Sequence, residues 1–168
     1  MQKSDWLKRT FPTGLAAGLL PFLLERQEGT AVRMDAKVKG ISDELLSRKL
    51  DNKWSVKENI AHLAEMDEVA LRRLEQILSS APTLAPAVPG LQRDYNVVPV
   101  DEIIALFRRN RAIKLQRFRS LRDEDFLKTS VHPRLNITLN PVDLAFFESE
   151  HDDHHLVRVS EIINTLNS

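Results

Sequence analysis

The strongest constraint on the fold is a helical pattern that runs from Ser55 to about Ser79. Ser55 and Glu58 fit the S-x-x-E capping box, in which each side chain binds the backbone N–H of the other residue. Apolar residues then recur at spacings of three and four, as they do along one face of an α-helix; they are Val56, Ile60, Leu63, Ala70, Leu74 and Ile77. The segment is therefore predicted to be a long helix that buries one face against other helices.

Three further segments carry the same periodicity: 12–39, 101–121 and 140–166. In the first of them, Pro21 and Gly29 predict a kink or an irregular start, and its apolar residues, including Phe22 and Val32, are expected to face the core. Ile113 has the same expected role in the next segment. Short helical turns are expected at 42–47 and 123–126.

The last segment has a clear start, with Asn140 as N-cap, Pro141 at the first helical position and Asp143 in the first turn. All three residue types are favoured at that end of a helix. No segment shows the alternation of a strand, and the chain has no internal repeat. The predicted fold class is therefore all-α, a four-helix bundle.

The segment 81–99 contains four prolines and Gly90, which exclude a helix there. It is expected to be a loop that crosses the bundle. Loops of this length are uncommon in compact domains and are often functional or mobile.

Composition narrows the function. The 168 residues predict a single domain, 1–168. Lysine plus arginine and aspartate plus glutamate number 24 each, which argues against a main role in non-specific contact with DNA or an anionic membrane. The absence of cysteine excludes disulfides and thiolate ligands, so that a metal would need nitrogen or oxygen ligands. The apolar run at 15–24 is too short to span a bilayer, and no signal-peptide cleavage site follows it; a cytoplasmic protein is expected.

Histidines provide the candidate functional site. Three of the five lie in the run 151–155, and His151 and His155, four residues apart on one helix, can both reach one ion. They share a face with Leu144, Phe147, Ile162 and Leu166, which is predicted to face the interior. Buried histidines without partners would each cost about 1–3 kcal/mol, and a metal satisfies both. His154 is expected to point away from this face, and it suits a supporting role or a place on the surface. A fortuitous spacing remains the alternative to metal binding.

A third ligand must come from another helix. His62 lies two turns into the helix that starts at Ser55, close to its apolar face, whereas His132 lies in a connection before Pro133 and fits an ordinary loop residue. We therefore favour His62.

Carboxylates that could receive the other N–H of a metal-bound histidine are Glu58, Asp67, Glu148, Asp152 and Asp153. For Glu58, helix capping is the simpler role. Asp67 is as readily explained as a solvated surface residue, and Asp152 is expected to face away from the histidines. None is assigned as a general base.

Two other features have simple structural explanations. Trp54, which precedes the helix start, is interpreted as a hydrophobic staple. The basic residues of the third helical segment, interpreted mainly as a solvated face, could instead bind an anionic substrate or, less readily, nucleic acid; they are Arg108, Arg109, Arg111, Lys114, Arg117 and Arg119.

The runs from Trp54 to Leu63 and from Glu150 to Leu156 resemble the DinB/YfiT-like superfamily of small bacterial metalloproteins. The resemblance implies an up-down-down-up four-helix bundle with a long Pro-rich crossover between helices 2 and 3. It also implies a site made of His62, His151 and His155 that holds zinc or nickel, and a homodimer. The superfamily includes thiol S-transferases that use low-molecular-weight thiols, a maleylpyruvate isomerase and many members without an established activity.

Three imidazole ligands leave coordination positions open, which is typical of catalytic rather than structural metal. The expected function is a metal-dependent hydrolase or thiol S-transferase that acts on a small molecule, with water or a low-molecular-weight thiol activated at the ion. A non-catalytic metal-binding or stress-related protein is the alternative, and it predicts a fourth protein ligand or a closed cavity. A nucleic-acid-binding protein ranks third, because it requires Arg108 and Arg111 on one exposed face.

Overall fold

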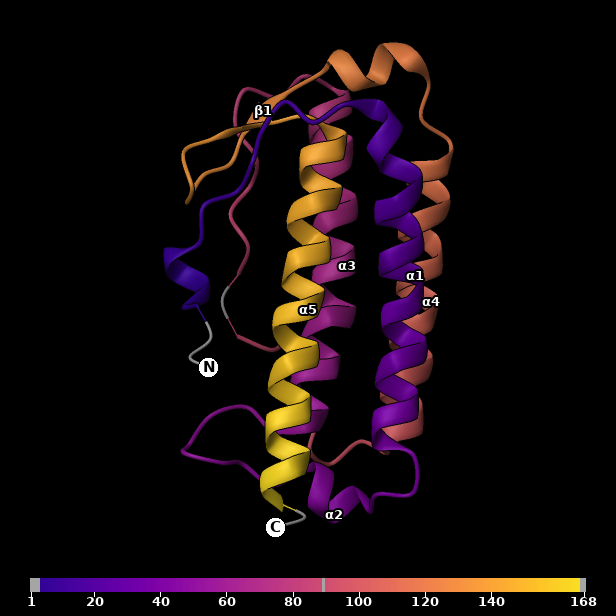
Figure 1. The fold of residues 1–168 in the computed structure, drawn as a ribbon, viewed down its shortest axis with the longest axis vertical. Coiled ribbons are helices and arrows are strands. Elements are labelled where there is room, and N and C mark those ends of the chain that lie inside the picture. Colours follow the sequence, from indigo (N-terminus) through magenta and orange to yellow (C-terminus); the bar gives the residue numbers. More distant parts are fainter. Residues whose placement is uncertain (1–3, 89, 167–168) are drawn as a thin grey trace.

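The computed structural model describes residues 4–88 and 90–166 of the chain. Four long helices, α1, α3, α4 and α5, form most of it (Figure 1). The elements in chain order are η1 (Trp6–Lys8), η2 (Ala17–Leu19), α1 (Leu20–Val38), α2 (Asp43–Leu46), α3 (Val56–Leu78), α4 (Val100–Arg119), η3 (Asp123–Leu127), β1 (Ser130–Val131), β2 (Thr138–Leu139) and α5 (Pro141–Leu166).

The helices form the predicted up-down-down-up bundle. In Figure 1, α1 and α5 run down the view whereas α3 and α4 run up it. Helix α3 packs on α4 and α5, and α1 packs on the same two helices. Because α3 and α4 are parallel neighbours, the chain must return along the bundle between them, and the Pro-rich segment 79–99 is this crossover. None of the helices within the described residues has the length and apolar character needed to cross a bilayer.

The expected helix starts are confirmed at α3 and α5. The backbone N–H of Glu58 donates to Ser55 Oγ at 3.1 Å, and that of Ser55 donates to Glu58 Oε2 at 2.8 Å. Asn140 and Asp143 form the same reciprocal pair, with N–H to oxygen distances of 2.8 and 3.0 Å. These local contacts satisfy backbone donors that a helix start otherwise leaves unpaired.

Helix α1 begins at Leu20, eight residues later than the sequence pattern suggested. Pro21 lies in the first turn, where its missing N–H breaks no helical hydrogen bond. The preceding residues instead form an irregular segment along the bundle, held where the N–H groups of Gly14 and Leu15 both donate to Asp143 at 2.9 Å.

Most of the apolar residues predicted to face the core on α1 and α4 are buried, but three of them are not. Phe22 is 73% exposed and Val32 61% exposed, whereas Gln27 and Thr30 of the same helix are fully buried. On α4, Ile113 is half exposed and Arg111 is buried. Polar residues therefore take the core-facing positions at this level of the bundle.

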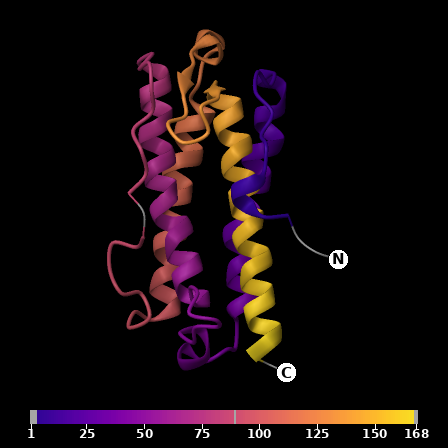
Figure 2. The same ribbon diagram turned by 90° about the vertical axis from the view of Figure 1, so that its left-hand side faces the viewer.

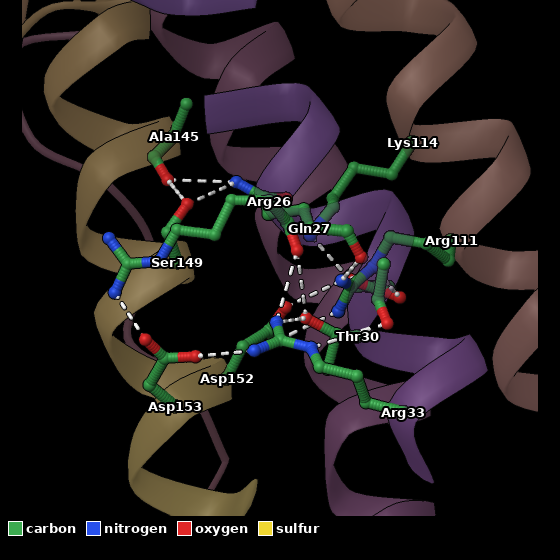
Figure 3. Close-up of polar contacts among 12 residues, drawn as sticks. Arg26, Gln27, Thr30, Arg33, Arg111, Lys114, Ala145, Ser149, Asp152 and Asp153 are labelled. Carbon is green, nitrogen blue, oxygen red and sulfur yellow. Dashed lines mark hydrogen bonds and ion pairs between the residues drawn. The ribbon is translucent and has the colours of Figure 1, made fainter. Parts of the chain in front are cut away.

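The reason is a buried polar layer formed by Gln27, Thr30, Asp67, Arg111, Lys114, Ser149 and Asp152. Figure 3 labels all of these residues except Asp67. Arg111 binds Asp67 through Nε at 2.9 and 3.0 Å, and Asp152 through its terminal nitrogens at 2.5 and 2.9 Å. Lys114 Nζ lies 2.5 Å from Asp67. The layer joins all four helices and separates two apolar clusters of the core.

A two-stranded antiparallel hairpin, β1 and β2, precedes α5, with Ser130 opposite Leu139. The sequence analysis expected no strand, because two residues per strand are too few to show alternation. We call the side of α3 and α5 that points away from α1 and α4 the outer face. The hairpin lies over the outer face, between the crossover and the segment that precedes α1, which we call the N-terminal segment (residues 4–19) (Figure 2).

Candidate metal centre

The structure brings His62 of α3 together with His151 and His155 of α5. His151 Nε2 lies 3.4 Å from His62 Nε2 and 3.1 Å from His155 Nε2, and the three potential ligand atoms all lie within 4.8 Å of one another. Two nitrogens bound to one zinc ion at about 2.0–2.1 Å in tetrahedral geometry lie about 3.3 Å apart. The spacing of the three imidazoles thus fits a single ion.

Asn59, one turn before His62, orients His155. Its amide Nδ2 donates to the backbone oxygens of Ser55 and Trp54 at 2.7 and 3.3 Å, so that its Oδ1 faces His155 Nδ1, at 2.8 Å. A carbonyl oxygen only accepts, and the ring proton therefore sits on Nδ1. The lone pair on Nε2 is then directed toward the other two histidines, which is the tautomer that a metal requires.

The sequence analysis missed Asn59 because it considered only carboxylates as supporting residues. A signal was present in the sequence, since Asn59 lies three positions before His62 and four before Leu63 and therefore shares their face of the helix.

Burial keeps the imidazoles neutral. Desolvation lowers the pKa of His62 to about 4 and that of His151 to about 3, and it lowers the pKa of His155 well below its ordinary value. Neighbouring imidazoles add to each decrease. At neutral pH the rings are therefore uncharged, which is the protonation state that binds a metal.

Asp67 and Asp152 do not support the histidines. Asp67, for which solvation was one expectation, is buried in the polar layer against Arg111 and Lys114. Asp152 faces away from the imidazoles as expected, but it points into the core and pairs with Arg111.

The other three candidate carboxylates, Glu58, Asp153 and Glu148, also make no hydrogen bond to the three histidines. Glu58 caps α3 and pairs with Lys49 at 2.8 Å, and Asp153 pairs with Arg26 at 2.5 Å. Glu148 is buried, and desolvation raises its pKa to about 7. Across residues 4–88 and 90–166, the group that could hold an ion consists of the three histidines, without a carboxylate.

Two tryptophans line the site. The ring of Trp54 lies 4.6 Å from that of His62, so the staple interpretation was wrong; the fourth helical position, where a staple needs an apolar partner, is Asn59. The ring of Trp6 lies 5.2 Å from His151 and 5.4 Å from His154.

Trp6 belongs to the N-terminal segment, which docks on α5 through long-range contacts. Arg9 pairs with Glu150 at 3.2 Å, and the rings of Phe11 and Phe147 lie 4.9 Å apart. The sequence analysis missed this segment, because nothing in a non-helical stretch indicates which helix it covers.

The basic residues of α4 do not form one exposed face. Arg111 and Lys114 are buried in the polar layer, whereas Arg108, Arg117 and Arg119 make surface ion pairs with acidic residues. The condition that the nucleic-acid hypothesis set for this helix is not met.

Comparison with known proteins agrees with this architecture. The sequence pattern of the DinB superfamily matches residues 28–157, and the chain belongs to this family. A solved structure of YfiT from Bacillus subtilis superposes with a TM-score of 0.82 at 17% identity, over 95% of this chain and 94% of that one. YfiT is described as a probable metal-dependent hydrolase with an unusual four-helix bundle topology. A search of curated proteins gives no match.

Proposed function

We propose that this protein is a metal-dependent enzyme in which His62, His151 and His155 hold one divalent ion, zinc or nickel. The observation that carries the proposal is the convergence of three neutral imidazoles without a fourth histidine, cysteine or carboxylate among the described residues. Such a ligand set leaves a coordination position for an exogenous group, as catalytic sites do. A purely structural site would be closed by a fourth protein ligand, so the enzyme is favoured over the non-catalytic alternative.

When bound, the ion supplies Lewis acidity that lowers the pKa of water or of a low-molecular-weight thiol. The protein orients His155 through Asn59, keeps the three rings neutral by burial, and shields them with Trp6 and Trp54. The proposed reaction is the attack of water or of a small thiol on an electrophilic small molecule. The description of YfiT supports the hydrolase form, and the family resemblance supports the thiol transferase form.

Metal removal tests this function. Protein stripped with a chelator and protein reloaded with Zn²⁺ or Ni²⁺ are assayed on activated esters and alkyl halides, with and without a small thiol. We expect turnover only after reloading, and its dependence on thiol separates transferase from hydrolase. Equal rates for the stripped and reloaded protein would contradict the proposal.

Replacement of Asn59 tests the role of the residue that orients His155. Asn59→Leu removes the acceptor at His155 Nδ1 and should weaken metal binding about 10–100-fold, as is typical when a supporting partner of a ligand is lost. Asn110→Leu on α4 is the matched control, because it removes another buried amide, which donates to Ala64 and Glu68 and contacts no histidine; its metal affinity should be unchanged. Competition with a chromophoric chelator measures the affinities; the same value for Asn59→Leu and the unsubstituted protein would show that Asn59 has no such role.

A further inference from the structure

Arg73 on α3 is a buried cation that makes no hydrogen bond or ion pair with another described residue. Its side chain is only 6% exposed, its Nε is buried with no hydrogen-bond partner, and none of the ion pairs among the described residues includes it, although others bury Arg111 and Lys114 between carboxylates. Desolvation lowers the pKa of its guanidinium, and the charge of Glu148 opposes this decrease without forming an ion pair. A buried charge that lacks a partner is strongly unfavourable, so this position calls for an anion from outside the chain.

His132, in the loop between β1 and β2, presents a second unpartnered donor. It is 4% exposed, and its Nδ1 accepts from the backbone N–H groups of Arg134 and Leu135 at 3.3 and 3.2 Å. Because Nδ1 is the acceptor, the proton of the neutral ring sits on Nε2. This Nε2 is buried and has no hydrogen-bond partner among the described residues.

Both donors lie on the outer face, on the same side of the bundle as the histidine cluster. Arg73 follows His62 by eleven residues, which is three helical turns and places both on the same side of α3. The His132 ring lies 5.5 Å from that of Phe147, one turn before His151, and the loop that carries it hangs between α3 and α5 (Figure 2). Trp6 contacts both Phe147 and His151, at 5.5 and 5.2 Å.

Electrostatics also place the two donors close to each other. After desolvation, the charge of Arg73 is the next cause that lowers the pKa of His132 to about 4. Arg134 lowers it further, so the potential at the His132 ring is positive. Glu148 is the nearby acid, and because burial raises its pKa to about 7, about half of it is uncharged at neutral pH.

We propose that Arg73 and His132 bind the anionic group, a carboxylate or a phosphate, of the substrate whose reacting group lies at His62, His151 and His155. An oxyanion accepts hydrogen bonds from both unpartnered N–H groups and neutralises the guanidinium. The substrate is thus an organic anion whose charge lies between one helical turn (at His132, beside Phe147) and three turns (at Arg73) from the histidines, roughly 5–16 Å along the bundle. This inference rests on the proposed function for the role of the histidines, but the anion site can be tested without it.

The test uses metal-free full-length protein titrated with inorganic phosphate and, separately, with acetate. Calorimetry gives the affinity, and ¹⁵N NMR follows Arg73 Nε and His132 Nε2. We expect saturable binding that shifts both nitrogens, and the tighter of the two anions identifies the group. Arg73→Leu should weaken binding at least tenfold, whereas Arg72→Leu, which removes an exposed charge from the next position, should change it less than twofold.

Thermal unfolding adds a readout that separates a binding role from a structural one. Without anion, Arg73→Leu should raise the melting temperature by several degrees, because an apolar side chain replaces an unpaired buried charge. An arginine that served the fold would show a decrease instead. Equal anion affinity in Arg73→Leu and the unsubstituted protein, or no binding of either anion, would overturn the proposal.

The two proposals fail independently. If neither anion binds but metal removal abolishes turnover, the enzyme remains and the anion site is wrong. If anion binding depends on Arg73 but no ion is retained by the histidines, the anion site remains and the metal enzyme is wrong. If both hold, Arg73→Leu should raise KM for anionic substrates at least tenfold while neutral analogues change little.

Discussion

Alanine at His151 or His155 is expected to abolish stoichiometric retention of a divalent ion, with a loss of affinity of at least about 100-fold. Loss of a supporting partner already weakens binding by about 10–100-fold, and each of these substitutions removes one of three direct ligands. The Nε2 atoms of His155 and His62 lie 3.1 and 3.4 Å from that of His151. Two nitrogens would remain after either substitution, and no described carboxylate is placed to replace the third.

Metal analysis of purified protein by mass spectrometry measures this effect, and His62→Ala should behave in the same way. His132→Gln is the matched control, because it removes an equally buried imidazole that lies outside the cluster. Its metal content should equal that of the unsubstituted protein. Equal content in all of the variants would show that the ion, if any, binds elsewhere.

Arg111→Met is expected to lower the free energy of unfolding by about 3–5 kcal/mol, the usual effect of removing one partner of a buried ion pair. Arg111 binds Asp67 and Asp152 at once and also donates to the backbone oxygen of Gln27 at 2.6 Å. Although burial opposes ionisation of Asp152, the guanidinium holds the pKa of that carboxyl below its ordinary value. Without Arg111, two buried carboxylates would share only Lys114.

Urea unfolding at pH 7 measures the change. Arg108→Met on the same helix is the control, since its pair with Asp35 is exposed and such pairs contribute at most about 1 kcal/mol. Adding Asp152→Leu to Arg111→Met should recover part of the loss, because it removes one uncompensated charge. If Arg111→Met costs no more than Arg108→Met, the polar layer does not stabilise the bundle.

The sequence by itself determined the four helices and two of their starts, because these depend on contacts within a few residues. Ser55 and Glu58 are three positions apart, as are Asn140 and Asp143, and each pair satisfies its own helix start. The same local rule placed His151 and His155 on one face. The late start of α1 was not predicted, because a proline is tolerated in the first turn of a helix and does not by itself mark where the helix begins. The hairpin was not predicted either, because a strand of two residues is too short to show an alternating pattern.

The tertiary structure alone decided which polar residues are inside. Asp67, Arg111 and Asp152 are charged residues of types that usually lie on the surface. They are buried here because three helices bring their opposite charges together. Asn59 meets His155 across 96 positions of sequence, Trp6 reaches His151 from a segment without helical pattern, and the hairpin places His132 against Phe147. A polar side chain is stable in a core only with a partner, and that partner comes from a distant part of the chain, so its position follows from the packing of the helices and not from the local sequence.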